Sequence, residues 1–216
     1  GVTRDRVQYE CEWGGRRFIV MDTGGWEAKP DGISIQVSAG AEQAMREADV
    51  LAFATWCLEK GTPDIIVNNA GHFVPGSIYN EAPGSLTSMI ESNLYSAYHL
   101  TRALLMPMMA AKTGHIFNIC SIASLHAYAN GGSYSISKFA LAGFTKNLRE
   151  ELKPHGIKVT GVYPGAVYTA SWDGSGVDPK RIMEAQDVAT MIVAAASLSI
   201  TAVVEDIVLR PQLGDL

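Results

Sequence analysis

Cysteine is scarce in this sequence of 216 residues, and histidine is too scattered to suggest a metal site. The three cysteines, Cys11, Cys57 and Cys120, are odd in number and widely spaced. They frame neither a disulfide scaffold nor a zinc site, and they favour a reducing, cytoplasmic location. None of the five histidines lies three or four residues from another, the spacing that places two ligands on one helix face. We therefore expect no metal site.

Long hydrophobic runs and a strong net charge are also missing. Serine and threonine interrupt the most apolar stretch, residues 189–204, and Asp187 and Glu205 flank it. This pattern predicts a buried helix followed by a strand, not a membrane span. The first twelve residues lack the apolar core of a secretory signal. The formal charge of −5, from 17 basic and 22 acidic residues, disfavours nucleic-acid binding by phosphate neutralisation. We expect neither a membrane nor a nucleic acid as partner.

The chain does contain an alternation of strand and helix patterns. Near the N-terminus, residues 7–13 and 16–21 flank Gly14-Gly15 and predict a β-hairpin. A helical pattern then runs from Ile35 to about Leu58. Further strand patterns occupy residues 64–67, 115–120, 157–163 and 205–209, and helical patterns occupy residues 86–111 and 134–152. Strands separated by helices of this length predict one α/β domain over residues 1–216, with a mostly parallel sheet covered by helices on both faces.

The N-terminal hairpin is expected at one edge of this sheet. In that arrangement residues 16–21 serve as a buried parallel strand, and residues 7–13 as its antiparallel partner at the edge. Helices on both faces and the sheet between them give a three-layer architecture.

Residues with chemical potential follow the ends of the predicted strands. Tyr134 and Lys138 are four residues apart near a helix start, so they share a face of that helix. Ser121 comes directly after one strand, and Asn68-Asn-Ala-Gly71 ends another. Because ligands bind beyond the carboxyl ends of the strands in open α/β sheets, these groups and Pro164-Gly165 are expected to meet there.

This set resembles the short-chain dehydrogenase/reductase family over residues 50–216. The resemblance rests on five elements in the family's order, which are Asn68-Asn-Ala-Gly71, Asn93, Ser121, Tyr134-x-x-x-Lys138 and Pro164-Gly-Ala-Val-Tyr-Thr169. The ending, residues 203–211, is similar to bacterial sepiapterin-reductase-like members. The resemblance implies a Rossmann-like fold and an enzyme that reduces a carbonyl or oxidises an alcohol of a small molecule. It also implies NADP or NAD as cofactor, NADP slightly preferred, and a homodimer or homotetramer.

The resemblance assigns roles to four catalytic residues. Tyr134 is the general acid or base, and Lys138 lowers the pKa of its phenol and hydrogen-bonds the nicotinamide ribose. Ser121 holds the carbonyl oxygen of the substrate, and Asn93 holds a water that links Lys138 to solvent.

Further residues are assigned to the cofactor by the same resemblance. Asn68, Ala70 and Gly71 are expected along its adenosine side, and Thr169 at the nicotinamide amide. Tyr134, Lys138, Pro164, Gly165 and Val167 complete the implied cofactor contacts.

Taken singly, each of these residues also has a structural interpretation. Tyr134 is then an aromatic at a helix start and Lys138 a solvated charge. Ser121 is a cap of a turn or helix, and Asn93 bonds a neighbouring backbone carbonyl. Tyr168 and Trp172 either line a substrate pocket or are exposed loop aromatics.

A glycine-rich turn after the first strand, Thr-Gly-x-x-x-Gly-x-Gly in this family, is not found. It is needed because glycines let backbone amides approach the pyrophosphate of the cofactor. Thr23-Gly24 follows a strand, but the next glycine positions hold Ala28 and Pro30, and proline has no amide hydrogen. Asp173-Gly-Ser-Gly176 follows no strand.

Residues 1–49 resemble instead the switch regions of the tandem-domain ribosome-assembly GTPases, the EngA/Der family. In that resemblance Thr3 is the switch threonine and residues 22–25 sense the γ-phosphate. The phosphate loop G-x-x-x-x-G-K-[ST] and the guanine-reading Asn-Lys-x-Asp are absent from the sequence. The two resemblances meet at residues 48–50, which suggests a chimera.

Three functional hypotheses follow. The first is an NAD(P)-dependent oxidoreductase with Tyr134 as general acid or base. The second is a folded chimera with little or no activity, because the glycine-rich cofactor loop is missing. The third, disfavoured by the missing phosphate loop, is a GTPase fragment.

Overall fold

The computed structural model describes residues 7–13, 16–22, 35–169, 172 and 176–216, with side chains from residue 48 onward. The chain divides into two compact units, residues 1–38 and residues 39–216. This division falls earlier in the chain than the predicted junction at residues 48–50. The single domain over residues 1–216 stays a prediction.

The first unit contains the predicted hairpin. Strand β1 (Val7–Trp13) pairs antiparallel with β2 (Arg16–Asp22), so that Val7 lies opposite Asp22 and Trp13 opposite Arg16. The two strands form a sheet of their own. The expected pairing of residues 16–21 with the parallel sheet of the second unit stays a prediction. A hairpin between adjacent segments closes a short loop, which costs less chain entropy than a parallel pairing with a distant strand.

The second unit is built on a parallel sheet of four strands. Its order is β3 (Ile65–Asn68), β4 (Gly114–Ile119), β5 (Ile157–Pro164) and β6 (Asp206–Leu209). All three pairings are parallel, with Asn68 beside Asn118 and Val162 beside Ile207. The predicted parallel sheet is confirmed, and each strand lies within one or two residues of its predicted position.

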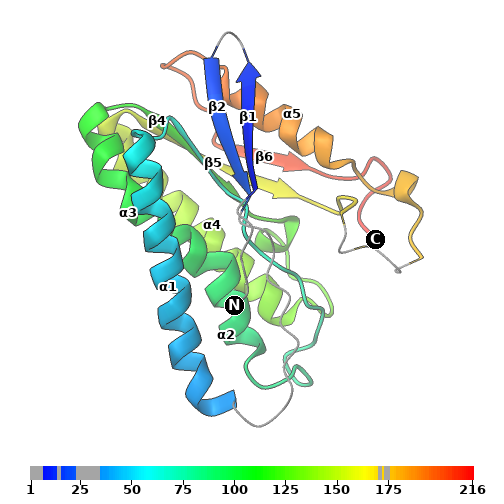
Figure 1. Ribbon diagram of the computed structural model, residues 1–216. Helices are drawn as coiled ribbons and strands as arrows, with labels where there is room; N and C mark the ends of the chain where they lie inside the picture. Colours follow the sequence, from blue (N-terminus) through cyan, green and yellow to red (C-terminus); the bar gives the residue numbers. More distant parts are fainter. Residues whose placement is uncertain (1–6, 14–15, 23–34, 170–171, 173–175) are drawn as a thin grey trace. The chain divides into compact units, whose positions relative to one another are not determined.

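Helices cover both faces of this sheet, as the sequence predicts. Figure 1 shows α3 (Ser96–Ala111) and α4 (Gly132–Leu152) on one side of the strands and α5 (Ala185–Ala196) on the other. On the first side, Ile66, Ile116 and Val159 pack with Leu104, Met108, Leu148 and Leu152 and with Ala54 of α1 (Ile35–Lys60). On the second side, Phe117, Val162 and Ile207 pack with Ala195. Neighbouring residues of β4 thus serve opposite faces, which follows from the two-residue period of a strand.

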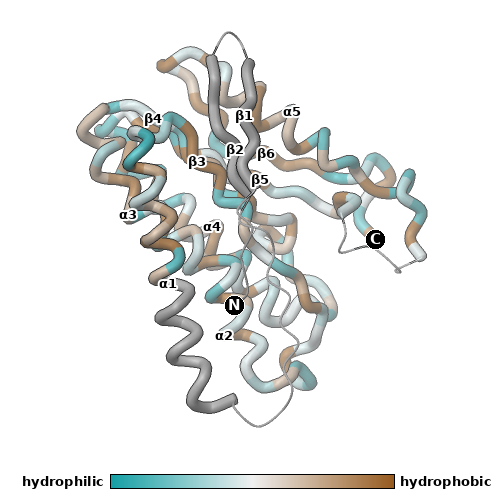
Figure 2. The backbone as a smooth tube through the Cα atoms, in the orientation of Figure 1, coloured by the Kyte–Doolittle hydropathy of each residue, from teal (hydrophilic) through white to brown (hydrophobic). Residues whose placement is uncertain are grey.

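The helical pattern at residues 86–111 forms a composite helix. It begins as α2 (Ser85–Ile90), continues through the π-helical turn η1 (Glu91–Tyr95), and becomes α3. Short 3₁₀ turns at Ile122–Ser124, Lys153–His155 and Pro179–Arg181 connect the remaining elements. Hydrophobic residues recur among hydrophilic ones along the helices (Figure 2). None of the helices, over the residues searched, combines the length and apolarity needed to cross a membrane.

Candidate active site

The two central residues of the site lie on the first two turns of α4. Tyr134 is half-buried, and the Nζ atom of Lys138 lies 5.8 Å from the centroid of its ring. Lys138 Nζ donates a hydrogen bond of 2.9 Å to the carbonyl oxygen of Ile119, the last residue of β4. The shared helix face predicted from the spacing is therefore confirmed, and it points to the carboxyl end of the sheet.

Lys138 is buried, with 5% of its surface exposed, and this changes its acidity. Burial lowers the pKa of its ammonium to about 8, because a charged group loses hydration inside the protein. Burial also raises the pKa of the neighbouring Cys120 thiol to about 11, so Cys120 is a neutral thiol at pH 7. Lys138 is no solvated surface charge.

Ser121 is both a cap and a neighbour of Tyr134. Its Oγ accepts a hydrogen bond of 3.1 Å from the backbone N–H of Ala123, which caps the short turn that follows β4. Burial raises the pKa of the Tyr134 phenol, while a side-chain hydrogen bond with Ser121 acts in the opposite direction. The predicted lowering of the Tyr134 pKa by Lys138 is wrong for this structure. Desolvation of the phenol dominates, and the ammonium is bonded to Ile119.

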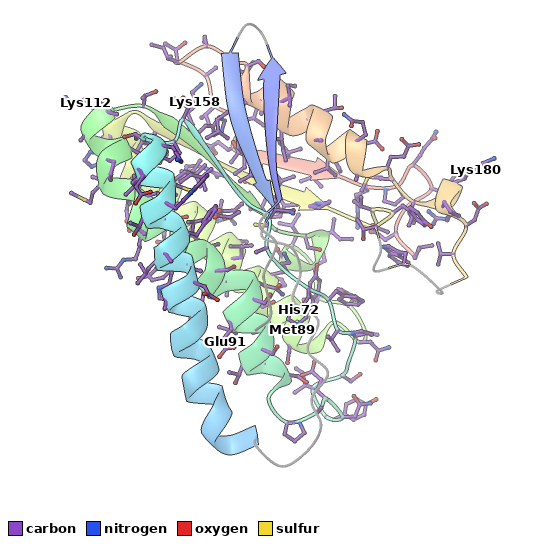
Figure 3. All side chains as sticks on the ribbon, viewed as in Figure 1. His72, Met89, Glu91, Lys112, Lys158 and Lys180 are labelled. Atoms are coloured by element: carbon purple, nitrogen blue, oxygen red, sulfur yellow. The ribbon has the colours of Figure 1, made fainter. Side chains whose placement is uncertain are left out.

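Asn93 lies in the π-helical turn η1 and is fully buried. Its Oδ1 accepts a hydrogen bond of 2.8 Å from the backbone N–H of His72, and its Nδ2 donates to the Ser137 hydroxyl at 2.9 Å. A π-turn inserts an extra residue into a helix and is frequent at functional sites. Here it carries the side chain that ties the segment after β3 to α4. In Figure 3, His72 and Met89 lie close together in this region, and both line the same hollow.

Gly71 is placed where no side chain fits. A Cβ at this position would come within 2.8 Å of Asn93 Oδ1 and 3.5 Å of Lys138 Nζ. The end of β3, the composite helix and α4 therefore meet at Gly71, beside the buried ammonium.

Asn68 directs its amide toward the interior. Its Nδ2 donates to Asn118 Oδ1 at 2.7 Å and to Thr101 Oγ1 at 3.0 Å, while its buried Oδ1 has no partner among the described residues. Asn118 in turn donates to Thr145 on α4 at 2.9 Å. This network joins β3, β4, α3 and α4. Ala70, two residues further along the chain, is exposed.

The segment 164–169 begins with the last residue of β5 and lies at the same end of the sheet. The N–H of Gly165 bonds to the carbonyl of Leu209 at 2.8 Å, and a Cβ on Gly165 would meet Asp215 Oδ1 at 2.8 Å. Val167 pairs with Met183 in an isolated parallel bridge. Thr169 is exposed, and its carbonyl accepts from the N–H of Trp172 at 2.9 Å. The five predicted elements thus all lie in one unit.

Several predicted positions lie outside the described residues. These are Thr3, Thr23-Gly24, residues 25–34 with Ala28 and Pro30, and Asp173–Ser175. Asp22 is the last residue of β2. Over the residues searched for a metal site, no group of three or more histidine, cysteine and acidic side chains is placed to hold an ion.

Four polar residues of this region are not identified by the sequence reasoning. Asn118 and Thr145 form the interior network, Ser137 bonds to Asn93, and Glu81 bonds to Ser133 at the start of α4. One signal was available for Asn118, since a polar residue inside an apolar strand must find a partner. Glu81 carries no local signal, because its partner is 52 residues away.

Comparison with known proteins agrees with this arrangement. Residues 31–178 match the sequence model of the short chain dehydrogenase family. The match begins before residue 50, so the predicted start of the family segment is too late. A sepiapterin reductase of Chlorobaculum tepidum is 33% identical over 171 residues, covering 78% of this chain and 70% of that protein. An uncharacterized oxidoreductase of Staphylococcus aureus (strain USA300) is 30% identical over 151 residues, covering 70% of this chain and 65% of that protein.

Solved structures give the same result. A metagenomic short-chain oxidoreductase in complex with NADP is 32% identical, with a TM-score of 0.63, covering 77% of this chain and 70% of that chain. Serine dehydrogenase from Escherichia coli is 26% identical, with a TM-score of 0.66, covering 75% and 70%. The chain thus spans about two thirds of the length of these relatives. With the parallel sheet, its helices and the family match over residues 31–178, these likenesses establish that the chain belongs to the short-chain dehydrogenase/reductase family.

Proposed function

We propose that this protein is an NADP- or NAD-dependent oxidoreductase that reduces a carbonyl group, or oxidises an alcohol, of a small molecule. The observation that supports this most is the meeting of Tyr134, Ser121 and Lys138 at the carboxyl end of β4. A proton donor, a second hydrogen-bonding hydroxyl and a desolvated cation are the groups that carbonyl reduction requires.

Tyr134 acts as the general acid in this proposal. Because burial raises the pKa of its phenol, Tyr134 is protonated at neutral pH and donates its proton to the carbonyl oxygen as negative charge develops there. The Ser121 hydroxyl bonds to the same oxygen and orients it. In the reverse direction the phenolate form of Tyr134 takes the proton from the alcohol.

Lys138 supplies a positive charge that is buried away from water. Its charge acts through a lower effective dielectric than at the surface, so it stabilises more strongly the negative charge that develops on the substrate oxygen. The bond to Ile119 fixes the ammonium beside Gly71 and leaves its other hydrogens for a ribose hydroxyl.

A nicotinamide cofactor fits the described part of the site. The Lys138 ammonium has hydrogens left for a ribose hydroxyl, and a donor from outside could satisfy the orphaned Oδ1 of Asn68. Lys138, Tyr134 and Thr169 would hold the nicotinamide riboside. Asn68, Ala70, Gly71, Pro164, Gly165 and Val167 would border the cofactor. When bound, the nicotinamide supplies or accepts the hydride. NADP bound to the metagenomic relative supports this assignment.

The test is the replacement Tyr134→Phe in a screen of small carbonyl substrates with NADPH and NADH. We expect the reduction rate at saturating NADPH to fall about 10²- to 10⁴-fold, the contribution typical of a general acid. Tyr98→Phe is the control, because Tyr98 lies on α3, where its hydroxyl accepts a hydrogen bond from Arg102, and it is not part of the proposed site. Activity that survives Tyr134→Phe would overturn the mechanism.

A second candidate is a folded chimera without activity, with a GTPase-like N-terminal segment. The sequence feature that favours it is the missing glycine-rich turn, since Pro30 stands where the family has glycine. Titration with NADPH, followed by nicotinamide fluorescence, separates the two. Saturable micromolar binding supports the oxidoreductase, and no binding up to millimolar NADPH supports the inactive chimera. Magnesium-dependent GTP binding would revive the GTPase fragment.

A further inference from the structure

The helix that carries Tyr134 has no cap of its own. The N-cap residue of α4 is Gly131, which makes no side-chain hydrogen bond, and the first turn contains no acidic residue. The start of a helix leaves four backbone N–H groups without partners inside the helix and carries a partial positive charge. A carboxylate from elsewhere in the chain would satisfy both.

Glu81, in the segment before α2, supplies that carboxylate. Its Oε1 accepts a hydrogen bond of 2.7 Å from the backbone N–H of Ser133, and its Oε2 accepts one of 2.5 Å from the Ser133 hydroxyl. These two bonds lower the pKa of the Glu81 carboxyl, so the group is ionised at neutral pH. Ser133 is itself 2% exposed and directly precedes Tyr134.

Tight packing around Glu81 shows that this contact is specific. Gly132 has φ +35°, and a Cβ there would collide with Glu81 Oε1 and with the Gly76 carbonyl. A Cβ on Gly76 would lie 2.7 Å from Glu81 Cγ. Glycine at both positions therefore lets the carboxylate reach the helix.

A second set of bonds joins the same two segments. The N–H of Gly76 bonds to the carbonyl of Asn130 at 3.1 Å, and the Ser77 hydroxyl donates to Asn130 Oδ1 at 2.7 Å. Within the 76–81 segment, the N–H of Glu81 bonds to the Ser77 carbonyl at 3.0 Å. The start of α4 is thus tied to residues 76–81 at several points. Of the hydrogen bonds just given, only those accepted by Glu81 involve a charged group.

We infer that Glu81 is a positioning residue for Tyr134: its carboxylate holds the start of α4 and so sets where the phenol lies relative to Ser121. The catalytic consequence rests on the proposed function. A displacement of about 1 Å costs on the order of 10²-fold in rate when reacting groups must be aligned. Glu81 touches neither substrate nor cofactor in this proposal.

The experiment compares Glu81→Ala with Glu151→Ala, which removes an exposed glutamate at the far end of the same helix. The readouts are kcat, KM and the Kd for NADPH, together with the NMR signal of the Tyr134 ring, assigned by Tyr134→Phe. For Glu81→Ala we expect kcat to fall at least about tenfold and the Tyr134 signal to shift, with the NADPH Kd within about twofold. Glu81→Gln, which keeps one acceptor oxygen, should recover part of the loss. Glu151→Ala should change nothing.

The inference is overturned if Glu81→Ala keeps kcat within about twofold of the wild type, or if it lowers kcat, NADPH affinity and the unfolding midpoint together. If Glu81→Ala does not fold, Ser133→Ala takes its place, because it removes the hydroxyl donor alone. We then expect a smaller fall in kcat and a smaller shift of the Tyr134 signal, with the NADPH Kd again within about twofold. If the wild type itself reduces no carbonyl, the proposed function fails separately. The Tyr134 signal then decides the positioning role, because a shift in Glu81→Ala supports it and an unmoved signal refutes it.

Discussion

Lys138 Nζ and the carbonyl oxygen of Ile119 are joined by a hydrogen bond of 2.9 Å. This bond links the second turn of α4 to the end of β4, in the interior of the unit. The ammonium has exchanged most of its water for this carbonyl, and burial lowers its pKa to about 8. The bond thus fixes the ammonium at the site. Burial of its charge lowers the free energy of unfolding, by an amount that depends on pH.

That cost gives the first prediction. The Lys138 pKa is about 8 in the folded protein and 10.5 as the reference for an exposed lysine, so between these values the unfolded chain binds more protons. The free energy of unfolding therefore rises with pH over this range and is lowest below pH 8. Relative to Lys138→Met, the wild type should gain about 3 kcal/mol between pH 7 and pH 10.5. Urea unfolding of both proteins at the two pH values measures this. Parallel pH dependence of the two proteins would refute it.

Gly71 gives the second prediction. In Gly71→Ala the new methyl group would press on Asn93 Oδ1 at 2.8 Å, and the bond from the His72 N–H to that oxygen would be strained. We expect a loss of about 1–3 kcal/mol, the cost of a buried polar group losing its partner.

The matched control for Gly71 is Gly143→Ala. Gly143 lies inside α4, and a Cβ there meets nothing within 4 Å. Since alanine is the better helix former, this variant should be more stable by about 0.5–1 kcal/mol. Thermal unfolding of both variants tests the pair, and an equal effect of the two substitutions would contradict the packing at Gly71.

Features set by short-range pattern were predictable from the sequence. The apolar run at residues 64–67 predicts a strand, and β3 is Ile65–Asn68. The four-residue spacing of Tyr134 and Lys138 places both on one face of α4, because 3.6 residues form a turn. The placement of the candidate site residues at the carboxyl ends of the strands follows from the alternation of strands and helices in a parallel sheet.

Features set by long-range packing were not predictable. The link between Glu81 and Ser133 spans 52 residues, and no local pattern marks either residue. The π-turn at Glu91–Tyr95 has an ordinary helical sequence. The predicted direction of the Tyr134 pKa shift is wrong, because the burial of the phenol depends on what the rest of the chain packs against it.

Arg149 on α4 gives the third prediction. Its Nε donates to the Val159 carbonyl at 3.1 Å, and its guanidinium bonds to the Glu205 carbonyl and to Asp206 Oδ1 at 2.8 Å. Arg149 thereby joins the helix to β5 and to the start of β6. In Arg149→Met these two carbonyls lose a charged donor, and we expect a loss of about 2–4 kcal/mol.

Two further variants sharpen the test of Arg149. Arg149→Lys keeps the charge without the planar fork, so its loss should be intermediate. Arg102→Met removes an exposed arginine of α3 and should cost at most about 0.5 kcal/mol. If Arg149→Met and Arg102→Met unfold at the same denaturant concentration, Arg149 does not hold the strands to α4.

The last prediction concerns the two faces of β3, the outer strand of the parallel sheet. Ile66 is 5% exposed and packs in the cluster with Leu104 and Ile116, whereas its neighbour Val67 is 44% exposed. Ile66→Ala should therefore lower the free energy of unfolding by about 2–4 kcal/mol, and Val67→Ala by less than about 1 kcal/mol. Urea unfolding measures both values. Because the two residues are neighbours on the same strand, the two substitutions differ mainly in which face of the strand they alter. A loss for Val67→Ala as large as for Ile66→Ala would show that both faces of β3 are covered in solution.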